Sequence, residues 1–178
     1  LSCVVTTTGT GNVTSTPRQV ELARDYRASA ILTTGDYLLH LADVAREMGL
    51  DPKRDLFLRA LPNVGDREKL EATFGIPVYR SYGFHEVQWV AVECAQRDGL
   101  HVFEDAYVVH VVDPETGERL PDGEQGSICV TELYKTGSPQ FRYDIKDLSF
   151  LYPRERCACG CWVRAIRHFS GRGGNKVK

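Results

Sequence analysis

The sequence predicts an α/β protein in which a parallel sheet covered by helices is followed by a small antiparallel β-subdomain. Two observations support this fold class. Up to about residue 92, short apolar runs alternate with stretches of helical spacing, as in strands joined by crossover helices. Beyond residue 100 the apolar residues instead recur at every second position, between turn-rich segments. We therefore divide the chain into an α/β subdomain over 1–92, a β-subdomain over 93–170, and a hinge or tail over 171–178.

Helix boundaries in the first part are set by proline and glycine. Pro17 suits a first helical position and predicts a helix over residues 17–27. Gly49 ends a second helix that starts near residue 35, and Gly75 ends a third over residues 66–74. Strands are expected in the apolar runs between and beside these helices, at residues 1–5, 29–34, 56–61 and 76–81. Ligands of a parallel sheet bind at the carboxyl ends of its strands, which is where residues 82–86 would lie.

The second part is expected to form antiparallel strands over residues 101–113, 126–134 and 140–144. Valine, isoleucine and tyrosine are frequent in these segments, and such side chains favour extended backbone. The connections at residues 113–117 and 120–123 contain proline, aspartate and glycine, which are typical of tight turns.

Composition excludes several classes of partner. The chain has 178 residues, of which 42% are apolar, and its 24 acidic and 22 basic residues give a net charge of −2. We expect no nucleic-acid partner, because no basic field is present. The apolar runs, such as residues 106–112, are far shorter than the ~20 residues of a membrane-spanning helix, so no membrane partner is expected either.

Cysteine usage points to the cytoplasm and to a metal. Three of the six cysteines fall within residues 157–161, where a bridge across Cys-x-Cys would be strained, so a reduced compartment is expected. Cys94 and His101 are two good ligands for a soft metal, and the 157–161 cluster offers two further thiolates for a tetrahedral zinc site. The alternative is a buried core thiol, a strand histidine and a reduced hairpin. Cys3 and Cys129 lie in apolar strand patterns and are expected to be ordinary core cysteines.

Several stretches together carry a family resemblance. In order, over residues 17–171, the chain is similar to the second half of the large domain of a phenylacetate-CoA ligase, a branch of the adenylate-forming superfamily. The stretches are YGFHE at 82–86, ECAQRDGLHVFED at 93–105, VVDPETGERLPDGEQGSICVTEL at 111–133, FRYDIKD at 141–147, and the CACG and SGR sequences near the end.

The resemblance implies a reaction with ATP, Mg²⁺ and CoA. A carboxylic acid attacks the α-phosphate of ATP, and CoA thiolate then displaces AMP from the acyl adenylate. In the Tyr-Gly-x-x-Glu signature, Tyr82 and the adjoining Gly83 would contact adenine, with Tyr82 stacked on its ring. Glu86 would hold Mg²⁺, which prefers carboxylate oxygen. Asp147 would accept hydrogen bonds from the ribose hydroxyls, and Arg172 would contact ribose or phosphate.

The resemblance also favours Cys157 and Cys159 over Cys161 as zinc ligands. The first two match the family-like Cys-x-Cys-Gly pattern, whereas Cys161 takes the place of an arginine. Cys161 nevertheless stays a competitor for the fourth position. Such a closed site would be structural rather than catalytic.

Departures from the family predict that the isolated chain does not complete the reaction. No Gly-rich Ser/Thr loop with a lysine precedes the match, and no lid domain follows it. Residues 59–62 read Arg-Ala-Leu-Pro where the family has Gly-Ala/Gly-Glu-Pro against adenine. His85 stands where the family has Ser or Thr. It either positions a carboxylate or phosphate oxygen, as a catalytic residue would, or packs as a satisfied polar side chain.

Three hypotheses follow from these residues. The first is a portion of an ATP-dependent aryl- or acyl-CoA ligase, whose substrate is a small carboxylic acid and, at the level of the family, an aromatic one. The second is a degenerate, non-catalytic homologue that serves as a binding or partner module. The third is a small protein whose zinc is its function. A homodimer, or the remaining parts of a longer chain, are the protein partners left open.

Overall fold

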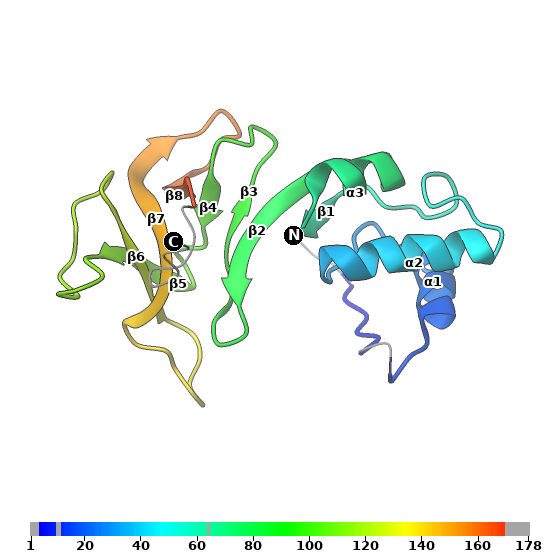
Figure 1. Ribbon diagram of the computed structural model, residues 1–178, viewed down its shortest axis with the longest axis horizontal. Helices are drawn as coiled ribbons and strands as arrows, with labels where there is room; N and C mark the ends of the chain where they lie inside the picture. The colour runs from blue at the N-terminus through cyan, green and yellow to red at the C-terminus, as the bar shows by residue number, and fades with distance from the viewer. Residues whose placement is uncertain (1–3, 10–11, 64, 170–178) are drawn as a thin grey trace, which may run out of the picture. The chain divides into compact units, whose positions relative to one another are not determined.

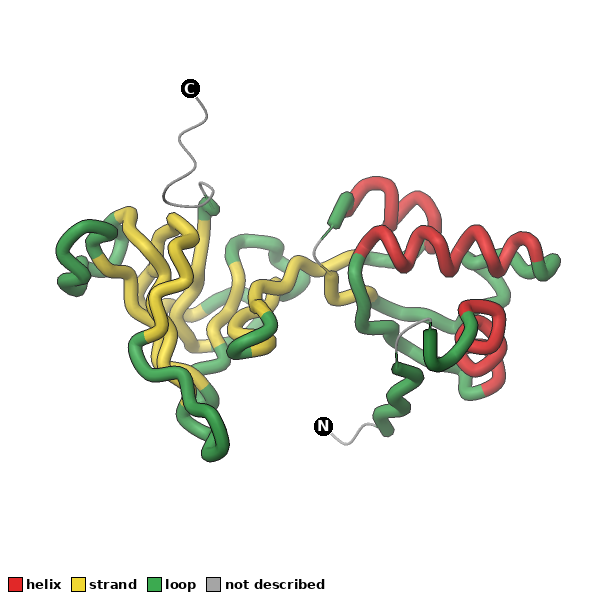
Figure 2. Tube along the Cα trace, turned by 60° about the horizontal axis from the view of Figure 1, so that its bottom comes forward, coloured by secondary structure: helices red, strands yellow, loops and turns green. Residues whose placement is uncertain are grey.

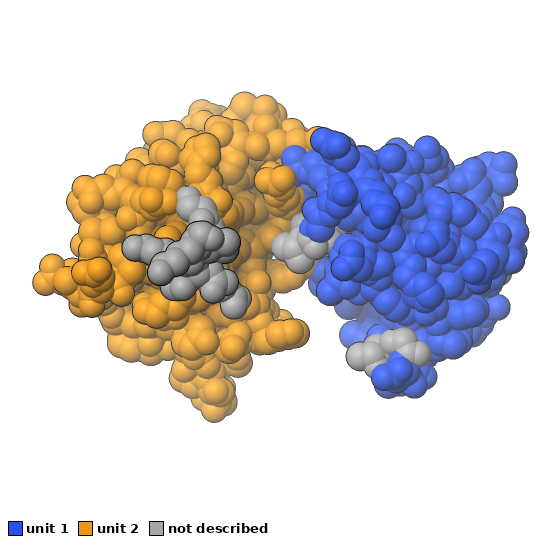
Figure 3. All heavy atoms as spheres, in the orientation of Figure 1, with its two compact units in different colours: residues 1–79 blue, residues 80–178 orange. Residues whose placement is uncertain are grey.

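The computed structural model describes residues 4–9, 12–63 and 65–169. They form two compact units, residues 1–79 and residues 80–178 (Figure 3). Cys3, Arg172 and the segment 171–178 lie outside the described residues. The division predicted between residues 92 and 93 concerns domains rather than these units, and it stays a prediction.

The first unit holds all three helices of the described residues, as Figure 2 shows. They are α1 (Thr16–Asp25), α2 (Gly35–Glu47) and α3 (Arg67–Phe74), and the prediction of three helices in this part is confirmed. The Asp66 carboxylate caps α3 by accepting the Lys69 N–H over 3.1 Å, and Gly75 ends α3 at a φ of 68°. No described helix combines the length and hydrophobicity that crossing a membrane demands.

Apolar side chains at helical spacing build the core of the first unit. Val20 of α1, Leu38 and Leu41 of α2, and Leu70 and Phe74 of α3 are buried together. Each such side chain contributes about 1.5–3 kcal/mol when fully buried, so these five residues help to stabilise the packing of the three helices.

The second unit is built from strands (Figure 1). β2 runs from the first unit into the second, and the ladders that join β2 to β3, β3 to β4, β4 to β8, and β5 through β8 are antiparallel. The sheet order is β1-β2-β3-β4-β8-β7-β6-β5. β1 (Leu61–Asn63) lies in the first unit. The other strands are β2 (Val78–Phe84), β3 (Gln88–Glu93), β4 (Leu100–Val102), β5 (Tyr107–Val112), β6 (Gln125–Glu132), β7 (Tyr143–Arg156) and β8 (Trp162–Arg167).

The antiparallel part of the prediction is confirmed, but the parallel sheet covered by helices is wrong. Residues 29–34 and 56–60 form no ladder among the described residues. The Arg59 N–H donates to the Ser29 carbonyl over 2.8 Å, so these two segments are neighbours. One hydrogen bond does not make a strand pair, however, because a ladder needs a continuous series of exchanged backbone bonds. Residues 4–5, predicted as part of a first strand, are irregular and exposed.

The core of the second unit is a single cluster of buried apolar side chains. Val90, Val109, Ile128, Val130 and Ile166 are each at most 4% exposed, and they come from strands spread across the sheet. Alternate positions along β5 point to the other face, as the period-two pattern predicts. Cys129 is buried, as expected for a core thiol.

Candidate functional site

The hairpin between β2 and β3 carries the Tyr-Gly-x-x-Glu signature. A Cβ on Gly83 would lie 1.9 Å from the Gln88 carbonyl oxygen, so only glycine fits where the two backbones approach. The strand register shifts between Tyr82 and Gly83, and Gln88 adopts a φ of 65°. The hairpin therefore bends sharply, which leaves His85 and Glu86 exposed at its tip.

Two of the predicted nucleotide residues meet in the structure. The Tyr82 hydroxyl, on β2, donates to Oδ2 of Asp147, on β7, over 3.0 Å. The ring of Tyr82 also packs against Phe169, with ring centroids 4.8 Å apart and planes 34° apart. An aromatic face and a carboxylate are thus held next to one another, which is the pair that a nucleoside needs for its base and its sugar hydroxyls.

Glu86 has contacts that the sequence did not reveal. The Tyr143 hydroxyl donates to Oε1 of Glu86 over 3.5 Å, and the Tyr143 ring stacks on Phe84 with centroids 5.9 Å apart. Nζ of Lys135 donates to the Glu86 main-chain carbonyl over 2.7 Å. Tyr143 lies within the FRYDIKD stretch that carries the resemblance, so that motif was a usable signal. Lys135 follows a strand in an irregular segment, and no spacing marks it.

Four predicted metal ligands also come together in the second unit. The ligand atoms of Cys94, His101, Cys157 and Cys159 all lie within 4.8 Å of one another. Cys94 Sγ is 3.7 Å from Cys157 Sγ, and Cys159 Sγ is 3.6 Å from Nε2 of His101. Thiolates ~2.3 Å from one zinc ion in a tetrahedron are separated by about 3.8 Å, so these separations fit a four-ligand site.

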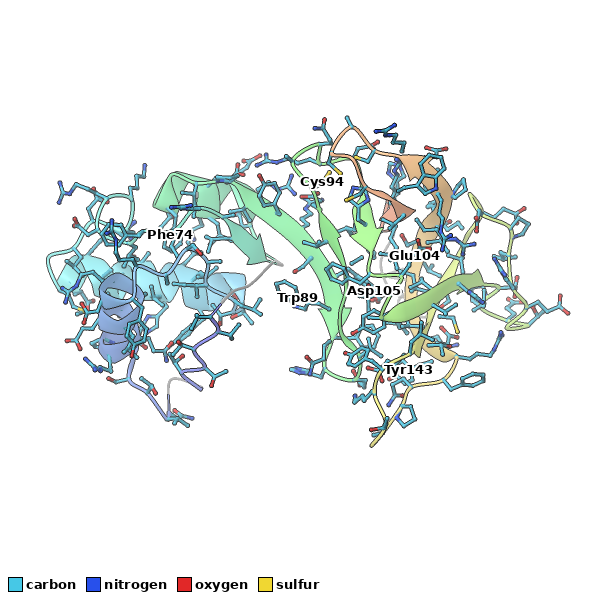
Figure 4. All side chains as sticks on the ribbon, turned by 180° about the vertical axis from the view of Figure 1, so that it is seen from behind. Phe74, Trp89, Cys94, Glu104, Asp105 and Tyr143 are labelled. Atoms are coloured by element: carbon cyan, nitrogen blue, oxygen red, sulfur yellow. The ribbon has the colours of Figure 1, made fainter. Side chains whose placement is uncertain are left out.

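Strand pairing explains why these residues meet. Cys94 directly follows β3 and His101 lies on β4, where it faces Val92 of β3 and Ala165 of β8. The other two thiols lie on the hairpin between β7 and β8, which is closed by the Cys157 N–H donating to the Cys161 carbonyl over 3.0 Å. The β4–β8 ladder brings the turn after β3 and the β7–β8 hairpin to the same end of the strands. In Figure 4, Cys94 lies far from Tyr143, at the end of β3 opposite the Glu86 hairpin.

The pKa shifts differ among the residues of the cluster. Burial, together with the nearby Arg167 charge, lowers the pKa of His101, so its imidazole is neutral at pH 7, as a metal ligand must be. Burial raises the pKa of Cys94 to about 11. A hydrogen bond from the Cys161 backbone N–H is the main reason why the pKa of Cys159 is lowered to about 7. A bound divalent cation would favour the thiolate form of all three cysteines.

Cys161 is outside the cluster in the structure. Its side chain is exposed, and a hydrogen bond with Cys159 raises its pKa.

Nδ1 of His101 is buried and has no hydrogen-bond partner within the described part of the chain. A ligating histidine usually donates from its second nitrogen, and the described residues supply no acceptor for that hydrogen bond here.

The comparison with known proteins decides the family. The phenylacetate-coenzyme A ligase of Pseudomonas putida is 39% identical over 78% of this chain, and that of Aromatoleum evansii is 35% identical over 86%. This chain belongs to the phenylacetate-CoA ligase family. It spans about one third of the curated relatives that it matches, since it covers 33% and 36% of those two proteins. No protein-family model matches the chain.

Solved structures agree with the resemblance. The phenylacetate-CoA ligase-like segment matches 2-hydroxyisobutyryl-CoA ligase, solved in an open conformation with 2-HIB-AMP and CoA, at a TM-score of 0.78 and 26% identity. The match covers 94% of this chain and 38% of that one. MatB from Rhodopseudomonas palustris matches at a TM-score of 0.57 and 19% identity, which shows the fold alone. The relatives are CoA ligases, and this chain corresponds to a portion of them.

Proposed function

We propose that these residues form part of the large domain of an ATP-dependent, AMP-forming acid-CoA ligase. A carboxylate oxygen of the acid attacks the α-phosphorus of ATP, and the bond from that phosphorus to the bridging oxygen breaks to release pyrophosphate. The CoA thiolate then attacks the acyl carbon, and AMP leaves. The hydrogen bond between Tyr82 and Asp147 carries this proposal, because it joins two separate motifs of the family resemblance in one site.

Each residue of the candidate site has a proposed role. Tyr82 stacks on adenine, which would also meet Phe169 beside it. Gly83 keeps the backbone close enough for the hairpin to fold. Asp147 accepts from the ribose hydroxyls, and the Tyr82 hydroxyl holds that carboxylate in place. The Glu86 carboxylate, exposed at the hairpin tip, is a suitable oxygen ligand for Mg²⁺.

The remaining assignments rest on sequence alone. Arg172 is proposed to contact ribose or phosphate, and exposed His85 to position an oxygen of the acid or of a phosphate. The relatives' names support a small carboxylic acid as substrate, and phenylacetate-named relatives favour an aromatic one. The isolated chain is expected to be inactive, since it covers about a third of those relatives. Free thiols at five described cysteines fit a cytoplasmic protein.

A separate observation favours a structural zinc ion. Three thiols and one imidazole lie within 4.8 Å of one another, with separations that suit a tetrahedron. The proposed ligands are Cys94, His101, Cys157 and Cys159, which leave no coordination position open for catalysis. Zinc here would tie the turn after β3 to the β7–β8 hairpin and so stabilise the edge of the second unit.

ATP–pyrophosphate exchange tests the ligase proposal. The full-length product of the gene is assayed with a panel of aryl and alkyl acids, and Asp147→Asn is compared with the exposed control Asp43→Asn on α2. Exchange that depends on one class of acid and is lost in Asp147→Asn supports the proposal. No exchange with any acid would favour the degenerate binding module. If His85→Thr raises the activity, His85 marks degeneration rather than a specialised role.

A further inference from the structure

A buried carboxylate lies behind the Glu86 hairpin. The side chain of Glu132, at the end of β6, is 0% exposed. Its Oε2 accepts the Gln140 N–H over 3.0 Å, while its Oε1 is buried without a hydrogen-bond partner in the described part of the chain. A carboxylate held away from water destabilises a fold strongly unless a cation lies near it.

Lys135 is the cation at this position. Its Nζ is 3.7 Å from Oε2 of Glu132, and its side chain is only 33% exposed. The same Nζ donates to the main-chain carbonyl of Glu86 over 2.7 Å. One ammonium group therefore lies between a buried carboxylate that keeps it in place and the backbone of the residue proposed to bind Mg²⁺.

A second tether holds the next carbonyl of the same hairpin. The buried Tyr107 hydroxyl donates to the carbonyl of Val87, and the Tyr134 hydroxyl donates to Tyr107 over 2.9 Å. Burial raises the pKa of Tyr107, so it stays a hydroxyl donor at neutral pH. Tyr134 adjoins Lys135 in the chain, so the short segment 132–135 contacts the Glu86 carbonyl directly and supports the Tyr107 hydroxyl that donates to the Val87 carbonyl.

We infer that Lys135, held by Glu132, is a positioning residue that fixes the hairpin carrying Glu86. The inference rests on the proposed function, since it gives Glu86 the role of a Mg²⁺ ligand. Mg²⁺ demands near-ideal octahedral geometry. The backbone that carries an exposed carboxylate ligand at a hairpin tip must therefore also be fixed in position. The Tyr143 hydroxyl orients the carboxylate itself, whereas Lys135 orients the backbone beneath it.

The expected effect is specific to the metal-dependent step. Without the Lys135 ammonium, the hairpin loses the contact at the Glu86 carbonyl while the contacts of Tyr107 and Tyr143 remain, so it samples a wider range of positions. A misplacement of about 1 Å can cost up to ~100-fold in rate, so Lys135→Met is expected to lower adenylation about 10- to 100-fold. It should also raise the Mg²⁺ concentration needed for half-maximal activity, while the KM for the acid changes little.

The test compares Lys135→Met with Lys135→Arg and with Lys69→Met in the full-length product of the gene. Lys69 is exposed on α3 of the first unit, so its substitution removes a charge without altering any of the hairpin contacts described above. Because Lys135→Met alone leaves Glu132 unpaired, the double variant Glu132→Gln/Lys135→Met is made as well, to keep a folded protein without that buried charge. Two readouts are taken: the Mg²⁺ dependence of pyrophosphate exchange, and amide hydrogen exchange over residues 84–88.

The inference predicts faster amide exchange in the hairpin and a higher Mg²⁺ requirement in both Met variants, with Lys135→Arg restoring both and Lys69→Met changing neither. Unchanged hairpin exchange in both Met variants would overturn it. So would faster hairpin exchange with an unchanged Mg²⁺ requirement, since the contact would then be merely structural. If the unaltered protein shows no pyrophosphate exchange, the ligase proposal fails, while hydrogen exchange still decides whether Lys135 holds the hairpin.

Discussion

The Tyr82 hydroxyl and the Asp147 carboxylate share a hydrogen bond of 3.0 Å although they are 65 residues apart in the chain. The bond connects β2 to β7, strands that are not neighbours in the sheet order. It therefore orders the candidate nucleotide residues before any ligand is bound. Such preorganisation lowers the entropy that binding must overcome.

The first prediction concerns this bond. Tyr82→Phe removes one hydroxyl and keeps the ring, so unfolding should become easier by about 1 kcal/mol while base stacking survives. Urea unfolding of Tyr82→Phe, Asp147→Asn and the double variant gives the coupling between them. Additive effects of the two substitutions would show that the hydrogen bond adds no stability.

The second prediction concerns the metal cluster. Protein purified without chelator should hold near one zinc ion per chain by elemental analysis. Cys157→Ser should lower the zinc content and the melting temperature, whereas Cys161→Ser, outside the cluster, should change neither. A loss of about 2 kcal/mol corresponds to roughly 4–8 °C for a chain of this size. Full stability in chelator, with no metal bound before treatment, would end the zinc proposal.

The third prediction concerns Gly83. Alanine there places its Cβ 1.9 Å from a backbone oxygen, so the hairpin must open, and we expect a loss of about 2–3 kcal/mol in unfolding free energy. Gly137→Ala is the matched control, since nothing lies within 4 Å of its added Cβ. It should stay within about 0.5 kcal/mol of the unaltered protein. Equal, small effects for both glycines would contradict the close backbone approach.

The fourth prediction concerns pH. Burial, aided by the positive charges of Arg119, Arg142 and Arg164, lowers the pKa of His110 on β5. The unfolded chain therefore binds a proton more readily than the folded one, so stability should fall as pH drops below the unfolded histidine pKa of ~6.5. Urea unfolding across this range should show that decline, and His110→Gln should flatten it. A decline of equal steepness in His110→Gln would assign the effect to other groups.

Local signals predicted part of this fold well. Pro17 and Gly75 mark helix boundaries through their own backbone preferences, so α1 and α3 were found close to their true limits. Residues 29–34 contain an apolar Ala-Ile-Leu run like that of a buried strand, yet a strand also needs a pairing partner, and no local pattern reports one. The prediction of a parallel sheet was wrong for this reason.

The candidate sites show the same limit. Cys94, His101, Cys157 and Cys159 were predicted as ligands from the preference of zinc for thiolate and imidazole. The structure brings their ligand atoms together, and metal binding stays a proposal. Lys135 was missed because its contact with Glu86 depends on the approach of two segments that are 49 residues apart. Arg172 was named from a motif and lies outside the described residues.

We propose that Tyr82, Glu86 and Asp147 form part of a nucleotide site, and that this chain, which covers 33% of its Pseudomonas putida relative, binds nucleotide only weakly. Titration of the 178-residue chain with AMP, followed by NMR, tests it most directly. The account predicts shifts confined to the surroundings of Tyr82 and Asp147, lost in Asp147→Asn, with a Kd no tighter than about 1 mM, or about −4 kcal/mol. Micromolar ATP binding by this chain, or AMP shifts that Asp147→Asn leaves unchanged, would contradict it.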